Sequence, residues 1–478
     1  MNNFPRLVIA GVRGGSGKTT LSLGLIAALR SKGLKVIPFK KGPDYIDAGW
    51  LSAAAKNPCY NLDPFFLSRQ KIMESFAMHF TGDIAVIEGN RGLYDGMDVE
   101  GSYSTAELAK FLHSPVILIV DCTKMTRTAA AVVLGCANLD RDVNIKGVVL
   151  NQVSGSRHES VVRQSIERYC SLPVLGSIPR LKSGEMPERH MGLTPYQEHP
   201  DTVKAIVTVE DIAKKYLDLD AIFDIARSAE PLNNRHEVIG YRQEEKAERA
   251  EINFLSPIAH SLSPVVKIGV IRDSAFQFYY PENLEELERN GAELVEINAV
   301  EGERLPDVDG LYIGGGFPET NAIKLAENAG FRESVRKAVE SGLPVYAECG
   351  GLMFLGDSIT VGGKAYPMVG IFPLVFEMKE KPQAHGYTIV EVKKDNPFYP
   401  VGTVLHGHEF HYSALVEVRE KTGIYMAFGM KRGQGIKDKA DGICYKNTLA
   451  TYTHIHALGA PEWAAGFIKK AEEFKEKR

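Results

Sequence analysis

The 478-residue sequence has few cysteines, no long apolar run and no excess of basic charge. Its six cysteines form no CxxC pair, which argues against a disulfide framework and against a zinc site. No apolar run approaches the roughly 18–20 residues that cross a bilayer, and the first residues lack the basic region of a signal peptide. The net charge of −4 leaves no basic field to attract nucleic acid or an acidic membrane surface. We therefore expect a cytoplasmic protein without a nucleic-acid or membrane partner.

Short apolar runs alternate with amphipathic stretches through the first two hundred residues. Runs such as VILIV are continuously apolar, which is typical of strands that are buried on both faces of a parallel sheet. The alternation predicts a doubly wound α/β domain. The expected strands are 6–12, 35–40, 84–89, 115–121, 145–151 and 173–178.

A polar, charge-dense stretch at 231–264 predicts a linker between a domain at 1–230 and a second domain at 265–478. An exposed helix on one domain is the alternative interpretation of this stretch. The alternation of strands and helices restarts after it, and from about residue 357 it changes to short β-like pieces. The second domain is therefore expected to be α/β with a β-rich portion and a C-terminal helix. Its first expected strands are 265–273, 293–299, 310–316 and 343–349.

GVRGGSGKTT, at 11–20, follows the first strand and opens a helix. Backbone N–H groups of such a turn surround phosphate oxygens, and the helix N-terminus adds a favourable field. Lys18 is expected to reach the β- and γ-phosphates, and Thr19 to hold Mg²⁺. Gly11 stands one residue too early for the strict G-x4-G-K-T spacing. The loop instead resembles those of dethiobiotin synthetase and ParA-like ATPases, in which a basic residue precedes G-G-x-G-K-T-T. The predicted nucleotide-binding residues are Arg13, Gly14, Gly15, Gly17, Lys18, Thr19 and Thr20.

Polar residues also follow other strands of this domain. KKGPDYID supplies Asp44 and Asp47, and IEGNRGLYDG supplies Glu88 and Asp95. Ligands bind at the carboxyl ends of strands in open α/β sheets, and carboxylates there can complete the shell of a Mg²⁺ ion. Asn151, at the end of a later strand, is a candidate for binding the adenine edge, or else a plain turn residue. The predicted Mg²⁺ ligands are Thr19, Asp44 and Glu88.

AECGGL places Cys349 after an apolar run and before two glycines. A free cysteine is usually a small core residue, and that is the alternative to a nucleophile. A cysteine nucleophile needs a base and an oxyanion hole of backbone N–H groups. We expect Gly315, in the GLYIGGGFPE stretch, and Gly350 to form that hole. The stretches HGHEFHYS and YTHIHA supply histidines, but they lack cysteines or acids at metal-ligand spacing.

Motifs along nearly the whole chain resemble those of the cobyrinic acid a,c-diamide synthase family. This family joins an N-terminal ATP-binding synthetase domain, dethiobiotin synthetase-like in fold, to a C-terminal class I glutamine amidotransferase domain. The resemblance implies that Cys349 releases ammonia from L-glutamine. It also implies that ATP activates the a and c acetate carboxylates of a tetrapyrrole, cobyrinic acid, for amidation by this ammonia. The motifs are GGSGKTT, KGPDYID, EGNRGLYDG, PERHMGL, DSAFQFYYPENLE, GGGFPE, AECGGLMFL and GHEFHYS.

The resemblance also implies that His454 is the base of the thiol site. Ordinary class I amidotransferases carry His-x-Glu, whereas His456 stands here in place of that glutamate. How His454 is oriented is therefore open, and His456 is the alternative base.

The EGNRGLYDG stretch departs from the family pattern, which runs closer to EGVMGL(F/Y)DG. Arg91 is either a surface residue or a partner for another carboxylate of the macrocycle. The second interpretation opens siroheme, sirohydrochlorin or its nickel form as alternative substrates. A ParA-like ATPase switch is the rival of a different class, and a dethiobiotin-type carboxylase is a rival enzyme; neither explains Cys349. A homodimer is one of the assemblies that the chain could form. The predicted substrate residues are Asp44, Tyr45, Ile46, Asp47, Asp95 and Arg91.

Overall fold

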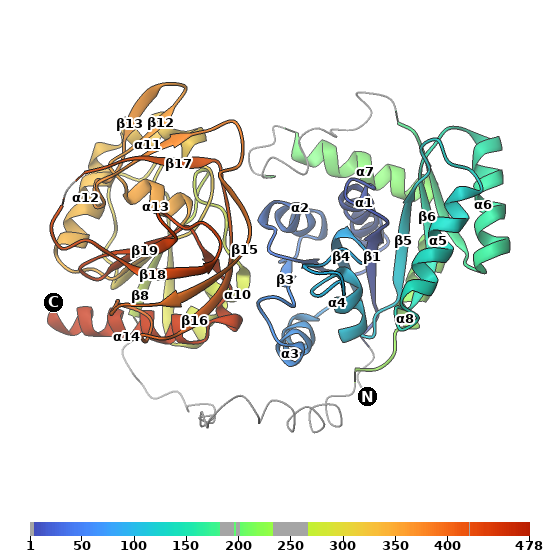
Figure 1. Ribbon diagram of the computed structural model, residues 1–478, viewed down its shortest axis with the longest axis horizontal. Helices are drawn as coiled ribbons and strands as arrows, with labels where there is room; N and C mark the ends of the chain where they lie inside the picture. The colour runs from blue at the N-terminus through green and yellow to red at the C-terminus, as the bar shows by residue number, and fades with distance from the viewer. Residues whose placement is uncertain (1–3, 182–195, 197–200, 233–265, 420) are drawn as a thin grey trace. The chain divides into compact units, whose positions relative to one another are not determined.

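The computed structural model describes residues 4–181, 196, 201–232, 266–419 and 421–478. The chain divides into two compact units, Met1–Phe254 and Leu255–Arg478, coloured from blue to green and from yellow to red in Figure 1. Apart from residues 231 and 232, the expected linker lies outside the described residues, and so does the PERHMGL stretch at 187–193. The linker therefore stays a prediction.

The first unit is built on a seven-stranded sheet with the order β3-β2-β4-β1-β5-β6-β7, in which every pair is parallel. All six strands expected from the apolar runs are present, which confirms the doubly wound α/β prediction. The short edge strand β3 was not predicted, because three residues carry no readable pattern. The strands are β1 (Arg6–Gly11), β2 (Val36–Lys41), β3 (Tyr60–Leu62), β4 (Ile84–Gly92), β5 (Val116–Asp121), β6 (Ile145–Val153) and β7 (Val174–Pro179).

Side chains of successive strand residues point to opposite faces of this sheet. Helices cover the apolar side chains on these faces. Leu7 and Ile9 of β1 share one core cluster with apolar side chains of α1, α2, α7 and α8. α1 is buried over most of its length, which holds the loop before it firmly at the end of β1. The helices are α1 (Lys18–Ser31), α2 (Tyr45–Ala55), α3 (Arg69–His79), α4 (Thr105–Phe111), α5 (Thr128–Leu139), α6 (Ser156–Cys170), α7 (Thr202–Tyr216) and α8 (Leu219–Arg227).

The second unit contains a ten-stranded mixed sheet with the order β21-β16-β15-β18-β19-β20-β11-β10-β8-β9. The strands from β20 to β9 are parallel, and those from β21 to β20 are antiparallel. A smaller sheet has the order β13-β12-β14-β17. The expected α/β domain with a β-rich portion is therefore present. Its strands are β8 (Val266–Ile271), β9 (Ala292–Ile297), β10 (Gly310–Ile313), β11 (Val345–Glu348), β12 (Ser358–Val361), β13 (Lys364–Pro367), β14 (Leu374–Met378), β15 (Ala384–Val392), β16 (Val404–His411), β17 (Ser413–Val418), β18 (Tyr425–Arg432), β19 (Ala440–Tyr445), β20 (Thr448–Thr451) and β21 (His454–Ile455).

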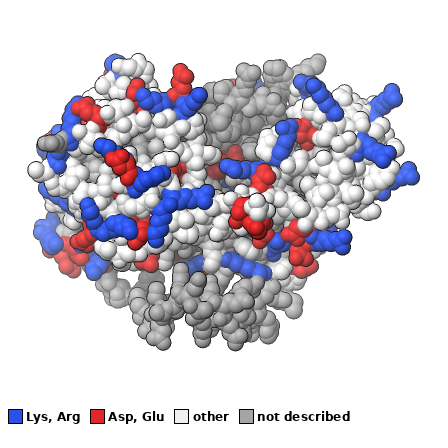
Figure 2. Space-filling view, viewed as in Figure 1, with Lys and Arg blue, Asp and Glu red and all other residues white. Residues whose placement is uncertain are grey.

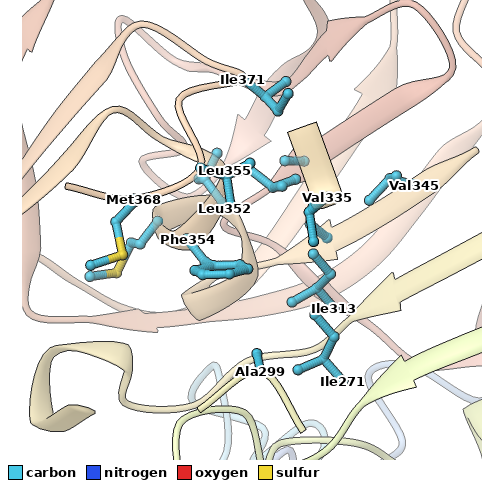
Figure 3. Packing of buried hydrophobic residues seen from close by; sticks show 14 of the residues in the cluster. Ile271, Ala299, Ile313, Val335, Val345, Leu352, Phe354, Leu355, Met368 and Ile371 are labelled. Atoms are coloured by element: carbon cyan, nitrogen blue, oxygen red, sulfur yellow. The ribbon is translucent and has the colours of Figure 1, made fainter. Parts of the chain in front are cut away.

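Two hydrophobic clusters lie on opposite faces of the large sheet. Ile313 and Val345 belong to the cluster that α12 and α13 cover, part of which Figure 3 shows. Tyr312 and Tyr346, the neighbours of these residues in sequence, belong to the cluster that contains Trp463 of α14. This packing fixes the ends of β10 and β11, which carry the predicted thiol site. The helical elements are α10 (Pro281–Arg289), η2 (Pro318–Asn321), α11 (Ala322–Glu327), α12 (Ala329–Glu340), α13 (Gly350–Leu355), η3 (Ala457–Gly459) and α14 (Glu462–Lys477).

The surface carries charges of both signs. In the view of Figure 2, basic and acidic side chains are interspersed. None of the helices in the described residues is both long enough and apolar enough to span a bilayer.

Candidate functional site

The phosphate loop lies between β1 and α1, at the carboxyl end of the central strand. Gly17 caps α1 with a φ of 93°, a conformation that glycine adopts without strain. A Cβ atom at this position would lie 2.4 Å from Nδ2 of Asn151. The same Nδ2 donates a hydrogen bond of 2.9 Å to the carbonyl of Ser16. Asn151 therefore supports the loop, while its expected contact with adenine stays a prediction.

Lys18 lies where the loop meets the end of β4. Its Nζ donates to the carbonyl of Arg91 at 2.6 Å and to that of Arg13 at 3.5 Å. Arg91 has a φ of 49° and an exposed side chain. Burial lowers the pKa of Lys18. The EGNRGLYDG stretch thus approaches the phosphate loop through its backbone.

A buried cluster of charges joins β2, α2 and β4. Nζ of Lys40 lies 2.7 Å from Oε1 of Glu88 and 3.0 Å from Oδ2 of Asp47. Glu88 is fully buried, and its Oε1 also accepts from Oγ1 of Thr19 at 3.1 Å. Burial raises the pKa of Glu88, although Lys40 opposes the rise. The pKa of Lys40 is itself raised, because Asp47 and Glu88 together outweigh the effect of its burial.

This cluster fits a magnesium ion. Oε2 of Glu88 is buried and has no hydrogen-bond partner within the described part of the chain, and the Thr19 hydroxyl lies on the same carboxylate. Within the described ranges no three His, Cys, Asp or Glu side chains form a complete metal site. Mg²⁺ is commonly held by one or two carboxylates together with substrate phosphates and water. The donor set around Glu88 meets that description.

Asp44 caps the N-terminus of α2. Its Oδ1 accepts from the backbone N–H of Asp47 at 2.8 Å. Burial, and then the charge of Asp47, raise the pKa of Asp44 to about 7. Tyr45 and Ile46, the next two residues of α2, are half-buried. The predicted substrate residues of KKGPDYID therefore occupy the first turn of one helix.

The remaining predicted residues of the first unit lie at other strand ends. Oδ2 of Asp95 accepts from the N–H of Gly92 at 2.8 Å, which closes the turn after β4. The exposed Arg13 pairs with Asp121, at the end of β5, over 2.7 Å. Gly14 and Gly15 are exposed, and Thr20 is half-buried in α1.

Cys349 stands between β11 and α13 with a φ of 47° and a ψ of −96°. A positive φ in a residue other than glycine costs about 1–3 kcal/mol, a strain that a core cysteine does not require. Such a strand–turn–helix corner is also the geometry that presents nucleophiles in other enzymes. The backbone N–H of Cys349 donates a hydrogen bond to the carbonyl of Thr451 at 2.7 Å. Burial raises the pKa of the thiol, and the charges of Glu319 and Glu348 raise it further, so the thiol needs a base.

His454 lies at the same edge of the sheet as Cys349. β11 and β20 are parallel neighbours with Glu348 opposite Thr451, so both residues follow the ends of adjacent strands. Nδ1 of His454 lies 3.2 Å from Oε2 of Glu348. His408 of HGHEFHYS stacks on His454 with ring centroids 4.9 Å apart. Burial, followed by the neighbouring His454, lowers the pKa of His408 well below its ordinary value, so this ring is neutral.

His456 contacts a different acid. Its Nε2 lies 3.5 Å from Oε1 of Glu282, at the start of α10, and its Nδ1 accepts from the N–H of Leu458. The two histidines of YTHIHA therefore have separate carboxylate partners. Which of them is the base stays a prediction, and the contact to Cys349's neighbour favours His454.

The glycines expected to form the oxyanion hole lie close to these residues. A Cβ atom on Gly315 would lie 2.5 Å from Cε1 of His454. A Cβ atom on Gly350 would lie 3.0 Å from the backbone nitrogen of Gly316. The two glycine turns thus meet beside Cys349, and only residues without a side chain permit this approach.

Both units match known protein domains. Residues 7–193 match the CobQ/CobB/MinD/ParA nucleotide binding domain, and residues 267–462 match the CobB/CobQ-like glutamine amidotransferase domain. The cobyrinate a,c-diamide synthase of Magnetococcus marinus is 43% identical, with 96% of each chain covered. That of Archaeoglobus fulgidus is 42% identical, with 99% of each chain covered. The chain belongs to the cobyrinate a,c-diamide synthase family. The predicted resemblance and the predicted two-domain fold class are thereby confirmed.

Sequence reasoning passed over several residues of this cobyrinate a,c-diamide synthase family member. Lys40 lies within the quoted KKGPDYID stretch, but nothing in the letters shows that it is buried between two acids. Asp121 ends a predicted strand, and that position is the only signal that it partners the loop. Glu348 lies directly before Cys349, where its contact with His454 depends on how β11 and β20 pair.

Proposed function

We propose that this chain is a glutamine-hydrolysing cobyrinate a,c-diamide synthase of cobalamin biosynthesis. The observation that carries the proposal is the strained, buried Cys349 beside the His454 segment, in a chain that also carries the phosphate loop. Relatives that align with nearly the whole chain are named cobyrinate a,c-diamide synthase. An ATPase switch or a dethiobiotin-type carboxylase would leave the thiol site without a purpose.

The thiol site releases ammonia. His454 takes the proton of Cys349, and the sulfur attacks the side-chain amide carbon of glutamine. N–H groups of the turns at Gly315 and Gly350 stabilise the oxyanion. The proton then passes to the leaving nitrogen, ammonia departs, and a thioester remains. Water hydrolyses the thioester to glutamate and restores the thiol.

The synthetase site activates a carboxylate. A side-chain carboxylate of the macrocycle attacks the γ-phosphorus of ATP, which gives an acyl phosphate and ADP. Ammonia then displaces phosphate and leaves the amide. Lys18 and the loop of Arg13, Gly14, Gly15 and Gly17 bind the phosphates, with Thr20 at the start of α1 and Asn151 on the adenine side.

Thr19, Asp44 and Glu88 would hold the magnesium ion of this site. When bound, the ion neutralises charge on the phosphates. Asp47, Tyr45, Ile46, Asp95 and Arg91 orient the macrocycle beside it, and Lys40 holds Asp47 and Glu88 in place. We assign the domains to 1–230 and 265–478 with a linker at 231–264. We place the reaction in the cytoplasm without a nucleic-acid or membrane partner, and a homodimer is compatible with it.

Incubation of the full chain with Mg-ATP and glutamine tests the substrate. Cobyrinic acid, sirohydrochlorin, its nickel form and siroheme are offered separately, and mass spectrometry counts the amides formed. Amidation of cobyrinic acid at the a and c positions supports the proposal. Amidation of a sirohydrochlorin-type ring instead would reassign the substrate, and ATP hydrolysis indifferent to every macrocycle would favour the switch.

A matched variant tests the nitrogen source. Cys349→Ser is expected to abolish amidation with glutamine while amidation with added ammonia continues, because the synthetase site does not use the thiol. Glutaminase activity that survives in Cys349→Ser would refute the assignment of the nucleophile.

A further inference from the structure

A buried carboxylate directly precedes the nucleophile. Oε2 of Glu348 lies 3.2 Å from Nδ1 of His454, and the exposed fractions of the two side chains are 0% and 3%. Glu348 is the last residue of β11, so its side chain lies on the face opposite to those of its sequence neighbours. The same strand end therefore presents a thiol at residue 349 and an acid against the histidine at residue 454.

A network of hydrogen bonds fixes this carboxylate. The hydroxyl of Tyr312 donates to Oε2 of Glu348 at 3.4 Å, and the N–H of Ile455 donates to Oε1 at 3.4 Å. Nδ2 of Asn283 donates to the Tyr312 hydroxyl at 3.3 Å and to the carbonyl of Ile455 at 3.0 Å. The acid is thus anchored both to its own sheet and to the strand that carries His454.

The buried surroundings of this acid are apolar and aromatic. The face of the sheet around Glu348 is lined by Tyr312, Tyr346, Trp463 and other apolar or aromatic side chains. Taking an ionised carboxylate out of water is costly unless it is paired and hydrogen-bonded. Among the described residues, His454 is the one cationic or imidazole side chain within ion-pair distance of it. The charge is therefore placed for the histidine.

We propose that Glu348 is the positioning residue of the base, in place of the glutamate of an ordinary His-x-Glu pair. This inference rests on the proposed glutaminase function of Cys349 and His454. The carboxylate accepts a hydrogen bond from the Nδ1–H of His454. The lone pair of Nε2 is then free to take the proton of the thiol. It also stabilises the imidazolium that forms when His454 takes the thiol proton. His456, which stands where the usual glutamate would be, contacts Glu282 instead.

Two variants, each of which removes the charge of one carboxylate, are compared to test this proposal. Glu348→Gln keeps the size of the side chain but removes its charge. We expect the kcat of glutamine hydrolysis to fall by about 10²- to 10⁴-fold, with KM for glutamine changed by less than about threefold. Glu282→Gln is the matched control, because it makes the same change at the neighbouring His–Glu pair, and we expect it to retain most of the activity. Glu348→Asp, which keeps the charge, should recover part of the loss.

Amidation with free ammonia separates this inference from the proposed function. Glu348→Gln should amidate cobyrinic acid with ammonia at the wild-type rate, since the synthetase site is unchanged. Wild-type chain that cannot use glutamine at all would sink the proposed function. Glu348→Gln that hydrolyses glutamine within about threefold of the wild-type rate would sink this inference alone. A large loss in Glu282→Gln, with Glu348→Gln active, would move the base to His456.

A measurement on the wild-type chain covers the case in which Glu348→Gln does not fold. Nitrogen-15 spectra of labelled histidines distinguish the two neutral tautomers, and loss of one signal in His454→Asn identifies this ring among the 13 histidines of the chain. The proposal requires the tautomer with the proton on Nδ1. A His454 ring with its proton on Nε2 would overturn it.

Discussion

Replacing Asp44 by asparagine should stabilise the first unit at high pH. Asp44 caps α2 through a side-chain oxygen that accepts from the N–H of Asp47 at 2.8 Å. Asparagine is as good an N-cap as aspartate, so the cap is kept. What the substitution removes is a carboxylate whose ionised form is disfavoured in the native state by burial and by the charge of Asp47.

The magnitude follows from the pKa. Folding raises the pKa of Asp44 from its ordinary value of 3.8 to about 7. At about 1.4 kcal/mol per unit this corresponds to about 4 kcal/mol. Because solvent reaches part of this side chain, we expect about half, or ~2 kcal/mol, in favour of Asp44→Asn above pH 8. The native state binds the proton more tightly than the unfolded state. The wild-type chain therefore gains stability as the pH falls from about 7 towards 3.8, and the advantage of asparagine should vanish in that window.

The chain offers a selective probe for this measurement. Its two tryptophans are Trp50, in α2, and Trp463, in α14. In a Trp463→Phe background, fluorescence during urea unfolding reports on the first unit alone. The comparison is made at pH 8.5 and at pH 5, without nucleotide and with the divalent cations chelated. The same Asp44→Asn chain should lose amidation activity, because we assign Asp44 to the magnesium and substrate site.

Two results would refute this reasoning. An Asp44→Asn chain that is less stable than the wild type at pH 8.5 would show that the native state favours the ionised carboxylate of Asp44. A stability difference that is equal at the two pH values would show that the pKa of Asp44 is not raised by folding.

Three further substitutions have expected outcomes. Gly17→Ala places a Cβ 2.4 Å from Nδ2 of Asn151 at a φ of 93°. We expect KM for ATP to rise at least about tenfold, and the free energy of unfolding in urea to fall by about 1–3 kcal/mol. Lys40→Met leaves two carboxylates without their buried cation, and we expect the first unit to lose about 3–5 kcal/mol. Gly315→Ala places a Cβ 2.5 Å from Cε1 of His454, and we expect glutamine hydrolysis to fall by about 10²-fold or more while ammonia-dependent amidation is kept.

Each of these substitutions has a matched control at a glycine or lysine outside the sites. A Cβ at Gly135, in α5, meets no atom within 4 Å, so alanine there should change neither KM nor stability by a comparable amount. Lys32 forms an exposed ion pair with Asp220. Lys32→Met should therefore lower the free energy of unfolding by less than about 1 kcal/mol. Gly17→Ala with unchanged KM for ATP, or Lys40→Met as stable as the wild type, would contradict the contacts on which these predictions rest.

Local patterns in the sequence were sufficient for much of the fold. The six expected strands of the first sheet are present because continuous apolar runs of this length are typical of strands that are buried on both faces of a parallel sheet. GGSGKTT likewise marks the start of α1, because its glycines and the following helix pattern act over a few residues. The three-residue strand β3 carried no such pattern, and the pairing of β11 with β20 joins segments about a hundred residues apart. No local rule predicts a pairing of that kind.

Residue types and short spacings were enough to predict the chemistry available to this protein: a phosphate loop, acids after strand ends, and a cysteine between an apolar run and two glycines. Which of these groups act on one another became clear from the folded domain. It placed Lys40 between Glu88 and Asp47, and it turned Glu348 towards His454. These contacts depend on strand order and on the alternation of side chains between two faces of a sheet, and both are set by packing over the whole domain.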